Sequence, residues 1–500
     1  MILEQNLRAM EQSREAYWLR YPATSPTKLR WRALTFRHSF HVLPGETILE
    51  LGAGSGLWTG HVADVLRNEN PITGAVFNRE LLKQSTRPNV RFQLVENLLR
   101  DLPAESFDYV IGTAILSHKE HENNVRALYR LLKPGGQLLF FEANYWNPQV
   151  AVKNAIPWLG HKMGNAGCQT GLRKYKLMKM ASRQGFAEID VIPYDIIHPR
   201  TPRSLVHGLQ SISFIAEHTP GVREMCGTLY IRARKPGGSA KRPSVNLAVH
   251  PEFLRSVSFV VPCHNEEMNI PQLVESILGY YDAYVHEILI VNDNSTDGTR
   301  EIAEQIAARD PRIKVLNRQP PNGVGRALRE GFAAASGSYI LTMDCDFLEI
   351  LPEFRDLFDA VTEGHDGAIG SRFSHESLLI NYPFFKILCN RGFHLLANLL
   401  LPLHVRDTSN NLKLYKTEIL RSINIEEDHF APNAETGLKP LLAGYNIKEV
   451  PISWINRTID MGKSSFRIVN AAPGYSKALL KLLAARNRKR VVRAAHGASA

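Results

Sequence analysis

Two carboxylates, Asp344 and Asp346, follow a strand-length apolar run that begins at Tyr339 and ends at Thr342. Side chains at positions i and i+2 of an extended segment point to the same side. Open α/β sheets bind ligands beyond the carboxyl ends of their strands, and a hard divalent cation in such a place takes oxygen ligands. An Asp-X-Asp pair also occurs in ordinary turns, so its surroundings decide between the two interpretations.

Two other apolar runs end in polar, mostly acidic residues upstream of this pair. The first run, 257–262, leads into His264 and Glu266, and the second run, 287–291, leads into Asp293. The residues after Asp293 form an acidic turn of the kind that caps a helix. Three strand tips with such side chains would build one pocket for a nucleotide sugar and a metal ion.

From about Val257 to Lys463 the chain resembles the family 2 glycosyltransferases with the GT-A fold. Within that family it is most similar to the polyprenol-phosphate (dolichyl-phosphate) mannosyltransferases. The resemblance implies a nucleotide diphosphate sugar as donor and inversion at the anomeric carbon. The markers that follow the acidic pair, in the order typical of the family, are Gly370-Ser371-Arg372-Phe373, the segment 407–415, Ala434-Glu435, Glu449-Val450-Pro451, Arg457 and Gly462-Lys463-Ser464.

The resemblance also assigns roles to residues at these strand tips. Asp344 and Asp346 would hold Mg²⁺ or Mn²⁺, which acts as a Lewis acid and neutralises the departing diphosphate. Leu348 stands where a polar side chain can complete the metal shell, and Cys345 is expected to be an inert spacer. The predicted nucleotide-sugar-binding residues are Pro262, His264, Glu266, Val291, Asp293, Asp344, Cys345, Arg372, Arg457 and Lys463.

Two kinds of acceptor are compatible with these residues. A lipid monophosphate has a second pKa of about 6, so it is already anionic and needs a positively charged cradle, for which Arg372 and Arg391 are the candidates. A sugar hydroxyl needs a general base, for which Glu435 is the candidate, although a carboxylate at a helix N-terminus is its alternative role. The predicted catalytic residues are Asp344, Asp346, Arg372, Arg391 and Glu435.

The first half of the chain carries a glycine-rich signature. The segment 46–51 is predicted to be a strand that runs into Gly52-Ala53-Gly54-Ser55-Gly56 and then into a helix. Glycines permit positive φ and let the backbone pass close to a cofactor, while the helix N-terminus adds polar donors. The spacing Gly-X-Gly-X-Gly differs from the dinucleotide fingerprint Gly-X-Gly-X-X-Gly. A predicted strand at 106–115, a helix and the segment 131–142 follow.

This order resembles a class I S-adenosylmethionine-dependent methyltransferase over about 45–142, and less clearly as far as Arg234. The resemblance implies S-adenosylmethionine as methyl donor. The first hypothesis for the whole chain is a glycosyltransferase fused to a methyltransferase, both acting in one cell-surface glycan or glycolipid pathway. Asn78 replaces the acidic residue that normally grips the ribose, so a catalytically inactive binding or docking module is the alternative. The predicted cofactor-binding residues are Glu50, Gly52, Ala53, Gly54, Gly56, Asn78, Glu96, Asn97 and Ala114.

Composition and length agree with two enzymes in one chain. With 500 residues, 44% of them hydrophobic and 22% charged, the chain has the composition of a soluble globular protein and suffices for two α/β domains. It contains no apolar run of about 18 residues, and its N-terminus lacks the apolar core of a signal peptide. Five scattered cysteines predict neither a disulfide framework nor a zinc site. The expected location is the cytoplasm, with peripheral attachment to the cytoplasmic face of the membrane as an option.

The predicted fold class is α/β, with an N-terminal Rossmann-like methyltransferase fold and a C-terminal GT-A fold. Pro, Gly, Ser and basic residues between Lys235 and Val245 bury little and mark the boundary. The leading segment, 3–37, is predicted to be a helix pair with Trp18 and Trp31 in the core, and a substrate lid is the alternative. The predicted domains are 1–235 (methyltransferase-like), 236–254 (linker), 255–470 (glycosyltransferase) and 471–500 (basic helix and tail).

The positive charge is concentrated at the C-terminus. Nine Lys or Arg and no acidic residue follow Asp460, and removing these nine from the formal net charge of +11 leaves +2. The segment 478–493 is typical of a short apolar helix with a cationic end, which suits contact with an anionic membrane surface. A docked terminal helix with a solvated basic end is the alternative. No recognised nucleic-acid-binding module accompanies the charge, so no nucleic acid partner is expected. A second apolar segment, 378–401, is a candidate for lipid contact, for the core or for a dimer interface.

Overall fold

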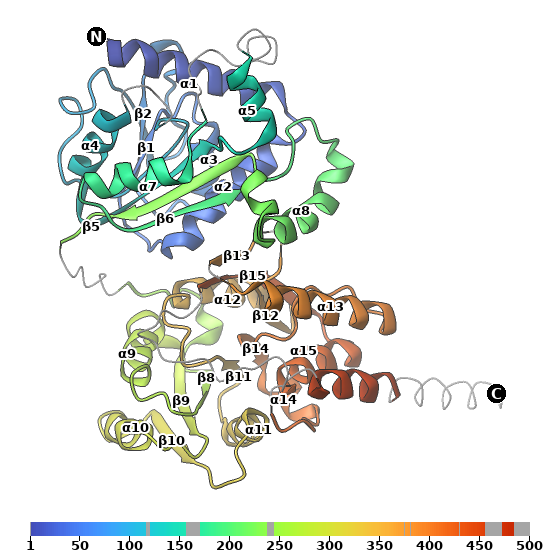
Figure 1. Ribbon diagram of the computed structural model, residues 1–500. Helices are drawn as coiled ribbons and strands as arrows, with labels where there is room; N and C mark the ends of the chain where they lie inside the picture. The colour runs from blue at the N-terminus through green and yellow to red at the C-terminus, as the bar shows by residue number, and fades with distance from the viewer. Residues whose placement is uncertain are drawn as a thin grey trace. The chain divides into compact units, whose positions relative to one another are not determined.

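The computed structural model divides into two compact units, Met1–Pro243 and Ser244–Ala500 (Figure 1). Both units are α/β, which confirms the predicted fold class. The residues that the structure describes are 2–116, 121–156, 171–237, 245–374, 376–380, 382–429, 431–455 and 473–484.

The N-terminal unit contains a seven-stranded sheet in the order β3-β2-β1-β4-β5-β7-β6. Strands β1 to β5 are parallel, whereas β7 is antiparallel to both of its neighbours. The strands are β1 (Ile48–Leu51), β2 (Ile72–Val76), β3 (Val90–Leu94), β4 (Phe107–Thr113), β5 (Leu132–Ala143), β6 (Ala187–Tyr194) and β7 (Thr228–Arg234). The helices are α1 (Ile2–Arg20), α2 (Ser25–Phe40), α3 (Leu57–Val65), α4 (His121–Leu131), α5 (Pro148–Ala155), α7 (Lys174–Arg183) and α8 (Arg203–His218).

Both faces of this sheet are covered, because successive strand residues point to opposite sides and both sets are apolar. In β5, Leu138 packs in the core beneath α4 and α7, whereas Leu139 packs in the core beneath α1, α2 and α3. Trp18 lies in the second core, and Trp31 packs against it while partly buried. The leading segment is therefore a helix pair that covers one face of the sheet.

The C-terminal unit contains a seven-stranded sheet in the order β10-β9-β8-β11-β14-β12-β15. Only β14 runs antiparallel to its neighbours, so the carboxyl ends of β8, β9, β11 and β12 lie along one edge. The strands of this sheet are β8 (Val257–Cys263), β9 (Val285–Asn292), β10 (Ile313–Asn317), β11 (Tyr339–Thr342), β12 (Gly367–Ser371), β14 (Lys413–Lys416) and β15 (Ile447–Pro451). A separate two-stranded sheet pairs β13 (Leu378–Ile380) with β16 (Ser453–Ile455).

Helix α13 (Phe384–Leu400) and a second helical segment at 473–484 pack against each other. Ala397 of α13 and Leu479 share one small core, so the segment 473–484 is docked on the domain. None of the described helices is long and apolar enough to cross a membrane. The α-helices are α9 (Ile270–Tyr281), α10 (Thr299–Ala307), α11 (Val324–Ala334), α12 (Arg355–Thr362), α13 (Phe384–Leu400), α14 (Thr417–Ser422) and α15 (Pro432–Ala443). The short 3₁₀ helices among the described residues are η1 (Arg79–Leu81), η2 (Val222–Met225), η3 (Pro251–Phe253), η4 (Asp282–Tyr284) and η5 (Leu351–Phe354).

Candidate active sites

The two predicted metal ligands follow the end of β11, at the carboxyl edge of the C-terminal sheet. Asp344 and Asp346 are both half-buried. Asn411 donates from Nδ2 to Asp344 Oδ1 at 2.7 Å and accepts at Oδ1 from the Thr342 hydroxyl at 3.1 Å. Because Asn411 is buried and fixed by the strand itself, it holds the Asp344 carboxylate in one orientation.

The acidic pair suits a hard cation that would take its remaining ligands from a substrate and from water. Asp344 and Asp346 supply carboxylate oxygens, which Mg²⁺ and Mn²⁺ prefer, and Leu348 supplies no ligand. The described residues contain no group of three or more His, Cys, Asp or Glu arranged to bind a metal. The donor set therefore fits an ion that is completed by diphosphate oxygens and water.

Asp293 and His264 lie at the tips of β9 and β8, on the same edge. The buried Asp293 carboxylate forms an ion pair with Arg318 through one oxygen and accepts from the Gly323 N–H at 2.7 Å through the other. His264 Nδ1 lies 3.0 Å from the carbonyl oxygen of Asp293. The half-buried Glu266 accepts from Asn269 Nδ2 at 2.5 Å. The structure thus brings these predicted residues to one edge, each of them already engaged by a neighbour.

Cys345 and Cys263 are buried side by side at the tips of β11 and β8, with their sulfur atoms 2.8 Å apart. Burial raises the pKa of the Cys345 thiol, and the neighbouring Cys263 raises it further. Both cysteines are free thiols. A protonated, buried thiol is a poor nucleophile, in keeping with a spacer role for Cys345. Pro262 of β8 is half-buried, and Val291 of the neighbouring β9 is buried.

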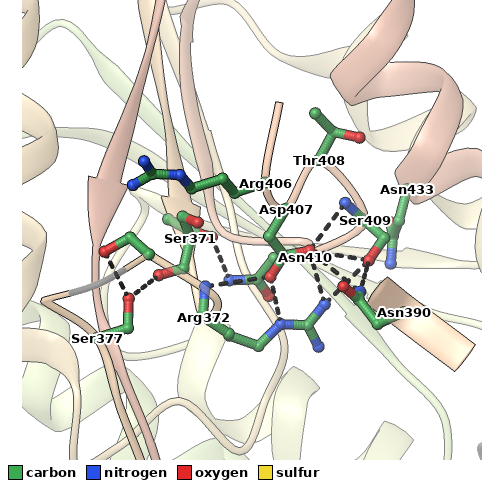
Figure 2. A network of polar contacts seen from close by, with 12 residues as sticks. Ser371, Arg372, Ser377, Asn390, Arg406, Asp407, Thr408, Ser409, Asn410 and Asn433 are labelled. Carbon is green, nitrogen blue, oxygen red and sulfur yellow. Dashed lines mark hydrogen bonds and ion pairs between the residues drawn. The ribbon is translucent and has the colours of Figure 1, made fainter. Parts of the chain in front are cut away.

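Arg372 follows β12 and is locked by Asp407 in the polar network of Figure 2. The Asp407 carboxylate accepts from Arg372 Nε at 2.7 Å and from Nη2 at 3.1 Å, and it has no exposed surface. Burial by itself would raise the pKa of Asp407, but the charge of Arg372, its hydrogen bonds and the nearby His394 together outweigh burial and hold that pKa well below its usual range. Ser409 and Asn390 complete the network, because the Asn390 amide donates to the Ser409 hydroxyl at 2.9 Å. Arg372 is therefore a fixed, permanent cation.

Two more cations reach this place from α13. The guanidinium of Arg391 stacks over the ring of Phe373 at 5.3 Å, and Arg372 lies over the same ring at 5.5 Å. Burial lowers the pKa of Lys386, the charge of Arg372 lowers it further, and Asp346 opposes both effects. Lys386 therefore lies within electrostatic range of Asp346 as well as of Arg372. These three cations, which we call the cationic cluster, are Arg372, Lys386 and Arg391.

Glu435, the candidate base, lies in the first turn of α15 and is buried. One carboxylate oxygen accepts from the N–H groups of Glu426 and Glu427, each at 2.9 Å, and the other pairs with Lys439 at 2.6 Å. Each oxygen is thus engaged within the protein. The predicted residues Arg457 and Lys463 lie outside the described residues.

The sequence did not predict roles for Asp407, Asn411 and Lys413, although all three lie in the 407–415 marker. Asp407 and Asn411 orient Arg372 and Asp344, as described above. Lys413 is fully buried and donates to the Asn433 carbonyl oxygen and the Thr436 hydroxyl, both at 2.9 Å. Burial lowers the pKa of Lys413 to about 7, although the charges of Asp407 and Asp344 oppose the shift. The available signal was a run of polar residues leading into a buried strand.

In the N-terminal unit the glycine turn follows β1, as predicted. Gly52, Gly54 and Gly56 have φ angles of 66°, 57° and 86°, in the left-handed region that disfavours other residues. Ala53 continues the sheet, because its N–H donates to the Ala75 carbonyl oxygen at 2.9 Å. Glu50 is buried and accepts from the Thr59 hydroxyl at 2.6 Å, and burial raises its pKa to about 7.

The other predicted cofactor residues lie at the tips of β2, β3 and β4, beside the glycine turn. Asn78 accepts at its side-chain oxygen from the Glu80 N–H at 3.0 Å and so caps η1. The N–H groups of Glu96 and Asn97 both donate to Asp101 at 2.8 Å. Ala114 has a positive φ of 55°. The sheet order β3-β2-β1-β4 places these three tips next to the glycine turn that follows β1, as a cofactor cleft requires.

The strand orders and the polar tips define the class of protein. A sheet with an antiparallel seventh strand between the fifth and the sixth is that of the class I methyltransferases, and an acidic pair after a central strand is typical of GT-A transferases. Residues 258–423 match the profile "Glycosyl transferase family 2", and residues 48–136 match the profile "Methyltransferase domain". The chain therefore combines a family 2 glycosyltransferase domain with a methyltransferase domain, and both predicted resemblances are confirmed.

The curated relatives match the C-terminal half of the chain. The polyprenol monophosphomannose synthase of Mycolicibacterium smegmatis is 29% identical over 213 residues, which cover 41% of this chain and 80% of the relative. The dolichol-phosphate mannosyltransferase of Pyrococcus furiosus is 28% identical over 203 residues, which cover 40% of this chain and 56% of the relative. The chain thus spans only about half the length of the second relative.

Solved structures resemble each half of the chain. A glucosyl-3-phosphoglycerate synthase of Mycobacterium tuberculosis, in complex with Mn²⁺ and uridine-diphosphate-glucose, is 23% identical. It matches 41% of this chain and 73% of its own, with a TM-score of 0.33. A SAM-dependent methyltransferase of Thermotoga maritima is 17% identical and matches 47% of this chain and 99% of its own, also with a TM-score of 0.33.

Proposed function

We propose that the C-terminal domain transfers a sugar from a nucleotide diphosphate sugar to a polyprenyl phosphate, and that the N-terminal domain is an S-adenosylmethionine-dependent methyltransferase. The observation that carries the sugar-transfer proposal is the cationic cluster. Arg372 lies over the ring of Trp454 at 5.4 Å, and the same ring contacts Phe347, which follows Asp346. Cations held by burial, stacking and a buried ion pair suit an acceptor that is itself an anion. The names of the two curated relatives agree with a polyprenyl or dolichyl phosphate.

A divalent ion held by Asp344 and Asp346 would neutralise the charge that develops on the departing diphosphate. Asp407 fixes Nε and Nη2 of Arg372. Among the described residues, Nη1 then has only a long contact of 3.5 Å to the Tyr382 hydroxyl. Nη1 would donate to the acceptor phosphate and orient it. A phosphate oxygen then forms the bond to the anomeric carbon as the bond to the diphosphate breaks.

The acceptor phosphate needs no general base, because its second pKa is about 6. A sugar hydroxyl would need one, and both oxygens of Glu435 are engaged by backbone N–H groups and Lys439. The geometry therefore favours the lipid phosphate over a glycan acceptor. We also propose that Asp293 and Glu266 bind the nucleoside, and that Arg457 and Lys463 add positive charge.

For the N-terminal domain, the glycine turn and the neighbouring strand tips support S-adenosylmethionine binding. The second candidate function is an inactive docking module. The local cap formed by Asn78 favours it, because the side-chain oxygen of Asn78 already accepts from the Glu80 N–H. We propose a division at the linker predicted for 236–254 and a role in cell-surface glycan or glycolipid synthesis. We also propose a cytoplasmic protein with peripheral membrane attachment through the basic residues after 484.

A panel of labelled nucleotide sugars, incubated with a short-chain polyprenyl phosphate and Mg²⁺ or Mn²⁺, tests the proposal. We expect Asp346→Asn to abolish transfer without unfolding the domain, and Glu349→Gln, an exposed neighbour, to retain it. Chelation of the divalent ion should stop transfer. Full turnover in chelator would refute the role assigned to the acidic pair.

A second pair of variants tests the acceptor. Arg391→Gln should raise KM for the polyprenyl phosphate while leaving the affinity for the nucleotide sugar unchanged. Arg406→Gln is the matched control, because Arg406 is exposed nearby and lies outside the cationic cluster. Equal KM values in both variants would argue against the cationic cluster as the phosphate site.

A further inference from the structure

Helix α1 places three charged side chains on the glycine turn of the N-terminal domain. Arg14 and Glu15 lie three and four residues after Glu11, so all three side chains share one face of the helix. They are nevertheless buried, with exposed fractions of 0%, 8% and 7%. Buried charges are costly unless they are paired and hydrogen-bonded, so their partners reveal what this face of the helix does.

Arg14 covers the carbonyl oxygens at the tips of β1 and β4. Its guanidinium donates from Nη1 to the Thr113 carbonyl oxygen at 2.6 Å and from Nη2 to the Gly52 carbonyl oxygen. A Cβ atom added to Gly52 would lie 2.9 Å from Arg14 Nη2. The guanidinium therefore fills the space that the first glycine of the turn leaves open.

Glu11 covers the N–H donors at the tips of β1 and β2. Its carboxylate accepts from the N–H groups of Gly54 at 3.0 Å, Phe77 at 2.9 Å and Asn78 at 2.6 Å. This carboxylate bridges the glycine turn and the end of β2, which is the position at which the sequence lacks an acidic residue.

Glu15 covers the rest of the turn. The Ser55 hydroxyl donates to its carboxylate, and the Ser55 N–H lies 3.5 Å from it. A Cβ atom added to Gly54 would lie 2.7 Å from Glu15 Oε2. The backbone groups that glycine exposes to a ligand are thus occupied by side chains of the same chain.

We propose that Glu11, Arg14 and Glu15 act as an internal ligand of the cofactor site, which S-adenosylmethionine must displace in order to bind. This inference rests on the proposed methyltransferase function of the domain. The cofactor carries an ammonium, a carboxylate and ribose hydroxyls, and α1 offers a guanidinium and two carboxylates to the same carbonyl and N–H groups. A lid that closed over a bound cofactor would leave those groups to the cofactor, whereas here α1 takes them.

Titration calorimetry of the full chain with S-adenosylmethionine tests the proposal. The Glu11→Ala/Glu15→Ala variant removes two of the three competing groups and should bind the cofactor at least tenfold more tightly than the unaltered protein. Gln12→Ala, an exposed position on the same helix, is the control and should bind as the unaltered protein does. Equal or weaker binding by the double variant would overturn the inference and leave the methyltransferase proposal intact. If none of the three proteins binds, the proposed methyltransferase function fails, and the inference fails with it.

Hydrogen exchange supplies a second test that does not depend on a stable variant. Adding saturating S-adenosylmethionine to the unaltered protein should speed exchange of the amides of α1, because the helix is released from the turn. Slower exchange in α1 would identify a lid and contradict the inference. Amides of α13, in the other unit, serve as the internal reference and should not change.

Discussion

The substitution Asp407→Asn tests whether one buried ion pair holds the acceptor site. The two side chains have nearly equal shape, so the change removes a charge and little volume. Arg372 would remain buried, with 11% of its side chain exposed, and would lose its only anionic partner among the described ion pairs. Breaking a buried pair by removing one partner costs about 3–5 kcal/mol. We therefore expect a loss of about that size in the free energy of unfolding of the C-terminal domain.

The assay is urea unfolding of the full chain, with pulse proteolysis as the readout. Proteolysis can report on the C-terminal domain separately, which matters because two domains do not unfold as one unit. Asp282→Asn provides the control within the same domain. Asp282 is half exposed and pairs with Arg312 at 2.8 Å, and exposed pairs contribute only about 0–1 kcal/mol. Adding Arg372→Met to Asp407→Asn should recover part of the lost stability, because no charge is then left buried without a partner.

The pH dependence gives the same experiment a second check. The pKa of Asp407 is depressed in the folded state, so its stabilising contribution is present above the ordinary Asp pKa of about 3.9 and is lost as the pH falls through the lower folded value. The deficit of Asp407→Asn should therefore be constant near neutral pH and shrink below about pH 4. A deficit under about 1 kcal/mol at pH 7, or one that does not change with pH, would refute the assignment of Asp407 as the fixed anion.

Three more predictions concern other parts of the chain. Gly54→Val, introduced into the Glu11→Ala/Glu15→Ala protein, should abolish S-adenosylmethionine binding in calorimetry. Gly54 has a φ of 57°, and a branched side chain there would meet the cofactor. Retained binding would place the cofactor elsewhere. Deleting 486–500 removes five basic residues, each contributing about 1 kcal/mol near an anionic surface. Co-sedimentation with anionic vesicles should fall sharply while transfer to a short soluble acceptor persists, and equal sedimentation would exclude the anchor. Burial lowers the pKa of Lys413 to about 7 in the folded protein, below the ordinary Lys pKa of about 10.4. Between about pH 7 and pH 10 the unfolded chain therefore binds one more proton at Lys413 than the folded protein does, and the free energy of unfolding should rise with pH over that window. Lys413→Gln should show a smaller rise in urea titrations, and an identical rise would contradict the shift.

Local patterns in the sequence located the strand tips well. The apolar run 339–342 is β11, and its two aspartates follow at the carboxyl edge of the sheet. The glycine turn follows β1 and has the positive φ angles that its spacing predicts. These features depend on neighbours in the chain, and propensity and periodicity report on such neighbours.

The partners of these tips depend on residues that are distant in sequence, and periodicity does not report on those. Asp407 lies 35 residues from Arg372, and Asn411 lies 67 residues from Asp344. Each of the two pairs joins strands or loops that become neighbours only through the sheet order. Their polar character inside a buried segment was visible in the sequence, but their partners were not.

The apolar segment 378–401 shows the same limit in another form. Its three predicted uses were lipid contact, core and dimer interface, and α13 buries only Ile387, His394 and Ala397. Its outward side exposes a stripe of large apolar residues: Phe385, Leu388, Leu395, Leu396 and Leu399. A mean hydropathy over the segment could not separate the two sides, because the helix is amphipathic with an unusually apolar outer face.

The two sites differ in what the chain itself has placed on them, and this difference governs how an assay of either activity is to be interpreted. In the C-terminal domain, Asn411 orients Asp344 and Asp407 orients Arg372, and the cationic cluster is the proposed place for an anion. In the N-terminal domain, α1 supplies both the cation and the anions of its own cleft. We therefore expect sugar transfer to proceed with the unaltered protein while methyl transfer is slow until α1 is released. Absence of methyl transfer in such a preparation would not identify an inactive domain, and only the variant without the charges at 11 and 15 separates a closed site from a lost one.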